Sequence, residues 1–173
     1  NLTSFTIPNS VTSIGASAFY GTVYYNDVSN WNNNVLYKDN CLLNALNGFS
    51  TSYSIQNNTR LIADYAFSST VLTSITIPSS VTSIGDGTFY NCYYLTSITI
   101  PSSVTSIVAQ AFAGCDNLTS VYCKPTTPPT LGSMAFGEIN SSRKFYVPMG
   151  SVNAYKGATN WSNYASSIEG YNF

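Results

Sequence analysis

The sequence contains no histidine, and charged side chains make up only 8% of its 173 residues. Without histidine the commonest general base is missing, and no Ser–His or Cys–His nucleophilic pair can form. Histidine is also a usual ligand of zinc, and the four cysteines include no Cys-x-x-Cys pair. We therefore expect no metal site, no other cofactor and no enzymatic activity.

Charged residues of both signs are few, with six basic and seven acidic residues, and no more than two of them are adjacent. No basic patch can neutralise a run of phosphates, which argues against a nucleic-acid partner. No apolar run approaches the roughly 20 residues of a membrane-spanning helix, so we expect no membrane insertion of this segment. Serine, threonine, asparagine and tyrosine must keep the surface polar, and this bias favours a secreted or cell-surface protein.

One pair of carboxylates needs weighing as a catalytic acid and base. Asp64 and Asp86 occupy equivalent positions in the repeats described next, and paired carboxylates are the machinery of glycosidases. We interpret them instead as solvated turn residues, because Ala109 fills the same position in the following repeat.

Near-identical segments recur along the chain. LTSFTIPNSVTSI begins at Leu2, LTSITIPSSVTSI begins at Leu72 and again at Leu95, and LTSVYC begins at Leu118. The last three starts are 23 residues apart. This period falls within the roughly 20 to 29 residues of leucine-rich repeats.

Each repeat contains the signature of a half-buried strand followed by a return segment. Residues 74–77 alternate isoleucine with serine or threonine, which predicts a strand with one buried face. Pro78 should end this strand because proline donates no ladder hydrogen bond. Val81 and Ile84 should turn inward on the return side, and Phe89 should lie in a short helical or 3-10 turn.

Stacked copies of this unit predict a β-rich leucine-rich-repeat solenoid of about seven coils with one parallel sheet. Residues 74–77, 97–100, 120–123 and 144–147 should be its neighbouring strands, with FYVP at 145–148 as the last of them. The stretch of about 20–50 is a divergent coil. Within it we expect a hairpin that turns at Lys38–Asn40.

We divide the chain into a solenoid at residues 1–150 and a C-terminal cap at 151–173. Trp161, Tyr164, Ala165 and Ile168 have the spacing of one helix face. The cap should therefore contain a small helix, with Asn160 at its N-cap.

The sequence resembles the BspA-type leucine-rich-repeat family of surface proteins from Bacteroides-like bacteria. The unit LTSITIPSSVTSIGDGTFYNC at 72–92 and its copies carry the resemblance, together with YVPMGSVNAYKGATNWSNYASSI at 146–168. The resemblance implies an extracellular or cell-surface bacterial protein, often linked to adhesion to host proteins or other cells. It supplies no ligand and no binding residues, because a fold does not fix a function.

The cysteines fit the interior of such a solenoid. Cys92 and Cys115 occupy the same place in successive coils, and Cys123 stands where a strand isoleucine would be. We expect small buried thiols that stack inside the core. A disulfide between Cys92 and Cys115 is the alternative.

The exposed side of the strands is the candidate binding surface. Two ladders of side chains should line it: Ser4, Ser74, Ser97, Ser120 and Lys144 in one, and Thr6, Thr76, Thr99, Tyr122 and Tyr146 in the other. Toward the C-terminus the small hydroxyl side chains give way to larger ones. We predict a ligand-binding site at Ser120, Tyr122, Lys124, Lys144 and Tyr146, because rigid tyrosines dominate many protein contacts.

Two functions compete for this surface. The first is non-catalytic binding of a protein partner, such as a host extracellular-matrix or cell-surface protein. The second is glycan binding, with tyrosines as stacking platforms. A pocket that places a planar aromatic ring beside asparagine or aspartate would favour the glycan.

Overall fold

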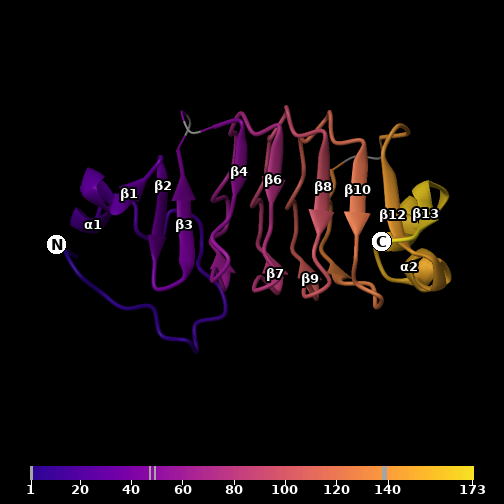
Figure 1. The fold of residues 1–173 in the computed structure, drawn as a ribbon, viewed down its shortest axis with the longest axis horizontal. Coiled ribbons are helices and arrows are strands. Elements are labelled where there is room, and N and C mark those ends of the chain that lie inside the picture. The colour runs from indigo at the N-terminus through magenta and orange to yellow at the C-terminus, as the bar shows by residue number, and fades with distance from the viewer. Residues whose placement is uncertain (1, 47, 49, 138–139) are drawn as a thin grey trace.

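The computed structural model describes residues 2–46, 48, 50–137 and 140–173. Successive repeats wind into coils that stack along one axis, with the N-terminal hairpin at one end and the C-terminal helices at the other (Figure 1). Buried side chains from every coil join into one continuous core. The repeats therefore build a solenoid with mostly parallel strands.

Strands occupy both sides of each coil. The exposed strand side carries β4 (Ser52–Ser54), β6 (Ser74–Thr76), β8 (Ser97–Ile100), β10 (Ser120–Cys123), β12 (Lys144–Pro148) and β13 (Ile168–Tyr171). The return side carries β5 (Leu61–Ile62), β7 (Ser83–Ile84), β9 (Ser106–Ile107) and β11 (Thr130–Leu131). The predicted alternation holds in β8, where Ile98 and Ile100 are buried while Ser97 and Thr99 are exposed.

The predicted single sheet is wrong. On the strand side, β8, β10, β12 and β13 form one parallel sheet, whereas β6 pairs with β4 in a separate two-stranded sheet. β6 and β8 lie side by side without a ladder between them. Their coils are joined elsewhere, because β7 pairs with β9 and the Phe89 amide donates to the Ala111 carbonyl. The coil number, predicted as about seven, stays a prediction.

The Phe89 segment forms no regular helix, but part of the predicted 3-10 turn is present, because the Tyr90 amide donates to the Gly87 carbonyl three residues earlier at 2.8 Å. The backbone amides of Gly87, Phe89 and Asn91 donate to the carbonyls of Ala109, Ala111 and Ala113 in the next coil. Every second backbone amide of this segment thus forms a hydrogen bond to the next coil. These amides are not available for the hydrogen bonds of a helix within their own coil. Gly87 has φ +52, and an added Cβ there would lie 2.4 Å from the Tyr65 ring. A side chain at this position would therefore displace the Tyr65 ring, although Tyr65 and Gln110 adopt a similar positive φ at the equivalent positions of the neighbouring coils.

The divergent coil contains the predicted hairpin. The N-terminal end comprises α1 (Val23–Asn26), η1 (Val28–Asn30), β1 (Trp31–Asn32), β2 (Val35–Lys38) and β3 (Cys41–Ala45). β2 and β3 pair antiparallel around Asp39 and Asn40, whose φ angles are 47° and 60°. Two consecutive positive φ angles are typical of the two-residue turns that match strand twist. β3 then pairs in parallel with β5.

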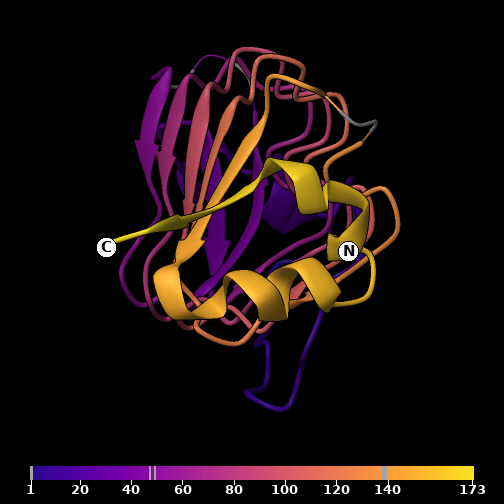
Figure 2. The ribbon, with the colours of Figure 1, turned by 90° about the vertical axis from the view of Figure 1, so that its right-hand side faces the viewer.

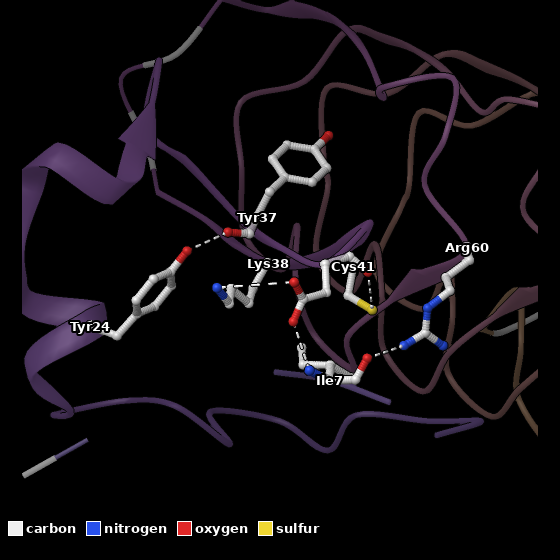
Figure 3. A network of polar contacts seen from close by, with 7 residues as sticks. Ile7, Tyr24, Tyr37, Lys38, Cys41 and Arg60 are labelled. Atoms are coloured by element: carbon white, nitrogen blue, oxygen red, sulfur yellow. Dashed lines mark hydrogen bonds and ion pairs between the residues drawn. The ribbon is translucent and has the colours of Figure 1, made fainter. Parts of the chain in front are cut away.

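The first repeat copy does not form a strand, so Ser4 and Thr6 do not extend the ladders. Residues 2–14 run along the outside of the stack. Side chains from other segments form hydrogen bonds with the backbone of these residues (Figure 3). The Ile7 amide donates to the Asp39 carboxylate at 2.7 Å. The Arg60 guanidinium donates to the carbonyls of Ile7 and Val11 at 3.1 and 2.9 Å. These bonds replace a strand ladder.

The C-terminal segment covers the last coil with η2 (Met149–Ser151), α2 (Val152–Gly157) and η3 (Trp161–Ser167) (Figure 2). Trp161 is fully buried, and its ring nitrogen donates to the Pro129 carbonyl at 2.8 Å. Asn160 stands at the N-cap position of η3, as predicted, but its φ is 63° and its side chain donates to the Leu131 carbonyl rather than capping the helix. The predicted helix is a 3-10 helix that ends at Ser167. Ile168, the last residue of the predicted helix face, is the first residue of β13 instead.

FYVP is therefore not the last strand. β13 follows it and pairs in parallel with β12, joining Phe145 to Ile168 and Tyr146 to Glu169. No helix among the described residues combines the length and the apolar character that crossing a bilayer requires. The division into a solenoid at 1–150 and a cap at 151–173 stays a prediction.

The buried and exposed sides of β8 predict opposite mutational sensitivities. Ile98 is 2% exposed and pairs with Val121. Ile98→Ala should lower the free energy of unfolding by about 2–5 kcal/mol, because it leaves a cavity in a packed core. Thr99→Ala should lower it by less than about 1 kcal/mol. Chemical denaturation measures both, and similar midpoints for the two variants would contradict the assigned faces.

The thiols should be inert while the protein is folded. All four cysteines are free and buried. Cys115 donates to the Phe89 carbonyl at 3.0 Å, and its hydrogen bond with Cys92 together with burial raises the pKa of Cys115. Burial also raises the pKa of Cys123. Because burial keeps the reagent from all four sulfur atoms, N-ethylmaleimide should add to no cysteine before unfolding and to all four afterwards. Intact mass reports the additions, and a Cys92–Cys115 disulfide would contradict the expectation.

Candidate functional site

The C-terminal part of the exposed strand face brings two of the predicted tyrosines together. Parallel pairing of β10 with β12 places Tyr122 opposite Tyr146. Both side chains point outward, because their neighbours Val121 and Phe145 fill the core. The two rings stack with centroids 4.8 Å apart and an interplanar angle of 19°. The sequence therefore predicted this contact correctly from strand alternation and repeat spacing.

The two predicted lysines lie at different edges of this stack. Ser120 pairs with Lys144 across the same strands, and the Lys144 ammonium lies 2.6 Å from the Glu169 carboxylate. The hydrogen bond with Glu169 raises the pKa of Lys144. The Lys124 ammonium lies 5.9 Å from the centre of the Phe173 ring, within the range of a cation–π contact.

Three residues of this face were missed by the sequence prediction, and all come from the last segment of the chain. Tyr171 sets its ring edgewise against Tyr122 and Tyr146, at centroid distances of 5.5 and 5.7 Å. Phe173 packs against Tyr171, and Glu169 holds Lys144. No alternation in the sequence marks this strand, because Ile168 is buried while Glu169, Gly170 and Tyr171 are all exposed.

We call Tyr122, Tyr146 and Tyr171 the tyrosine cluster. A shallow hollow of about 340 Å³ lies beside it. Its lining residues are Thr99, Tyr122, Lys124, Tyr171, Asn172 and Phe173. The hollow combines aromatic faces, one cation and small polar groups. That composition can bind a ligand but contains no arrangement of acid, base and nucleophile.

Upstream, the strand face carries only small hydroxyl side chains. Ser52 pairs with Ser74, and their side chains are hydrogen-bonded at 2.9 Å. Thr76, Ser97 and Thr99 continue the exposed row toward the tyrosine cluster. The candidate surface is thus asymmetric along the solenoid, with the large aromatic side chains at one end.

Asp64 and Asp86 come together, but in a structural role. Both residues are partly buried rather than solvated, which corrects our expectation. The Asp64 carboxylate accepts a hydrogen bond from the Asp86 backbone amide at 3.0 Å, and burial raises the pKa of Asp64. The carboxylate therefore ties two neighbouring coils. No group of three or more cysteine, aspartate or glutamate side chains in the described parts of the chain could hold a metal ion.

Comparisons with known proteins agree with this architecture. A crystal structure of a leucine-rich cell surface protein from Faecalibacterium prausnitzii A2-165 superposes with a TM-score of 0.50 at 23% identity. The match covers 96% of this chain but only 35% of that protein, so this chain spans about a third of its length. At this identity the likeness concerns the fold. No curated protein matches the chain.

The repeats themselves are specific enough to assign the family. The family described as "BspA type Leucine rich repeat region" matches in six copies, over residues 1–47 and 39–164. These ranges include the four near-identical units and the divergent hairpin. The chain belongs to the BspA-type leucine-rich-repeat family.

Proposed function

We propose that this protein is a non-catalytic binding protein, exposed on a bacterial surface or secreted, that adheres to a protein partner through the tyrosine cluster. A host extracellular-matrix or cell-surface protein is the proposed class of partner. The observation that carries the proposal is the packing of Tyr122, Tyr146 and Tyr171 on the solvent side of the sheet. These rings lie outside the buried core, so stability of the solenoid does not account for them.

Tyrosine suits a contact surface for physical reasons. Its ring offers a large rigid area at low cost in conformational entropy, and its hydroxyl adds a hydrogen bond. Packing of the three rings against one another holds each of them in place before a partner arrives. A preorganised surface loses less entropy on binding than a mobile one.

The charges beside the cluster can contribute to partner selection. Lys144 and Glu169 form an ion pair with side chains 41% and 48% exposed. Ion pairs at this exposure contribute little to stability, so both groups can re-pair with charges on a partner at small cost. Charges at the rim of a contact mainly set orientation and specificity.

Surface exposure of the protein is supported by composition and by the family. The polar character comes from uncharged side chains, with only 8% charged residues. The structurally similar protein from Faecalibacterium prausnitzii is described as a cell surface protein. We extend that location to this chain as part of the proposal.

The hollow beside the tyrosine cluster places Asn172 beside aromatic rings, which meets the criterion for a glycan, but the contacts between the rings favour a protein. Tyr122 and Tyr146 stack face to face, and Tyr171 meets both in an edge-to-face geometry. A sugar ring stacks on an open aromatic face, and the stacking occupies one face of each of these two rings. The segment that we interpret as a cap, 151–173, thus also supplies part of the proposed contact surface.

Removing the two stacked rings should abolish most binding without unfolding the protein. The variant Tyr122→Ala/Tyr146→Ala should lose at least about tenfold in affinity, because aromatic anchors dominate binding energy at contact sites. Binding is measured on immobilised extracellular-matrix proteins and mucins, and circular dichroism verifies the fold.

The matched control lies upstream on the same face. Thr76→Ala/Ser97→Ala removes exposed hydroxyl side chains outside the hollow and should bind like the parent protein. Loss of binding in this control, with full binding in the tyrosine variant, would place the contact elsewhere along the solenoid.

A further inference from the structure

A second hollow, of about 360 Å³, lies at the opposite end of the solenoid from the tyrosine cluster (Figure 1). Its walls come from the region of α1, η1, β1 and β2, before the regular repeats begin. The lining residues are Tyr25, Asn26, Val28, Trp31, Asn33, Asn34 and Leu46. The binding surface proposed above uses none of them.

Two aromatic rings form one wall of this hollow, and hydrogen bonds hold both in position. The Tyr25 and Trp31 rings meet edge to face, with centroids 5.1 Å apart and an interplanar angle of 87°. The Trp31 ring nitrogen donates to the Tyr25 carbonyl at 2.7 Å. The Asn44 side chain donates to the Tyr25 hydroxyl at 2.9 Å. Trp31 is only partly buried, whereas Trp161 is fully buried.

Asparagine side chains also line the hollow. Asn33 and Asn34 make the tight turn between β1 and β2, with φ angles of 49° and 62°. Such a turn is rigid, because only a few residue types adopt two consecutive positive φ angles. Both asparagines also line an adjoining hollow of about 620 Å³, together with Ser50, Ser52, Tyr53 and Ser54. An amide and hydroxyl rim therefore continues beyond the aromatic wall.

The lining selects a chemical class of ligand. No charged side chain is among the described residues that line either hollow, so an ionic ligand would find no counter-charge. An aromatic ring can contact the apolar C–H face of a sugar ring through a face that the other ring does not cover. Amides offer both donors and acceptors, which match hydroxyl groups that donate and accept. Small-molecule sites combine apolar or aromatic walls with a few fixed polar groups in this way.

We infer that this hollow is a carbohydrate-binding site for a neutral saccharide, with the Trp31 and Tyr25 rings as its apolar contacts and Asn33 as a hydrogen-bonding group. The site is independent of the proposed protein contact, because the two lie at opposite ends of the solenoid. It gives the protein one surface for a protein and another for a neutral glycan.

The two tryptophans allow a direct test on the intact chain. An array carrying neutral fragments of mannan, xylan and β-glucan, with N-acetyllactosamine and sialyllactose, identifies a bound oligosaccharide. That oligosaccharide is then added while acrylamide quenches tryptophan fluorescence. Because Trp161 is buried, quenching reports mainly on Trp31. Binding should reduce the quenching.

Variants separate this site from other surfaces. Asn33→Gly removes the amide while glycine tolerates the positive φ, so the fold is kept and affinity should fall about tenfold. Trp31→Ala should reduce affinity further. If Trp31→Ala does not fold, the affinity of Asn33→Gly alone tests the site. Asn40→Gly makes the same change in the neighbouring turn, where φ is 60°, and should bind like the parent.

The outcomes distinguish this inference from the proposed protein contact. Tyr122→Ala/Tyr146→Ala should bind the oligosaccharide as the parent does, even if its protein binding is lost. The carbohydrate site is overturned if no neutral oligosaccharide binds, if only sialyllactose binds, or if Asn33→Gly binds as tightly as Asn40→Gly. Unchanged acrylamide quenching in the presence of a bound oligosaccharide would overturn it as well.

Discussion

A column of stacked phenylalanine rings runs from coil to coil through the core, formed by Phe67, Phe89, Phe112 and Phe136. Neighbouring rings are nearly parallel, with centroids 5.1 to 5.4 Å apart, and all four side chains are buried. No coil could bury its own ring alone, so each depends on the next one. Backbone hydrogen bonds between the turns follow the same column. This dependence demands a close approach of the coils, which in turn explains why the turns form no regular helix.

A stack of this kind has two ends, and neither can be closed by another identical coil. At the C-terminal end Trp161 and Tyr164 pack on Phe136 and Phe145. Nearby, buried Arg143 donates hydrogen bonds to the carbonyls of Leu118, Phe136 and Cys115. At the N-terminal end a hairpin takes the place of a coil. Both ends depart from the repeat because their packing partners differ from those of an inner coil.

Because the two ends depart from the repeat, their surfaces carry side chains that the inner coils lack. An inner coil repeats serine and threonine on its outer face, which keeps the strands polar and uniform. The ends carry the tyrosine cluster on one side and the Tyr25–Trp31 wall on the other. Both aromatic groups are held by contacts made only in the folded chain, through the pairing of β12 with β13 and through the bond from Trp31 to the Tyr25 carbonyl. The solenoid thus separates two unlike aromatic groups.

Local sequence alone determined β6, β8 and β10, their buried faces and the β2–β3 turn, because alternation and turn chemistry act over a few residues. Repeat spacing likewise aligned Tyr122 with Tyr146. Only the tertiary structure decided the break between β6 and β8, and the arrival of Tyr171 beside the other tyrosines through β13. The first repeat copy makes the reason plain. LTSFTIP at residue 2 nearly matches the LTSITIP that forms β8, yet it is no strand. Its backbone groups form hydrogen bonds with Asp39 and Arg60. The local sequence pattern cannot predict partners that lie so far away in the chain.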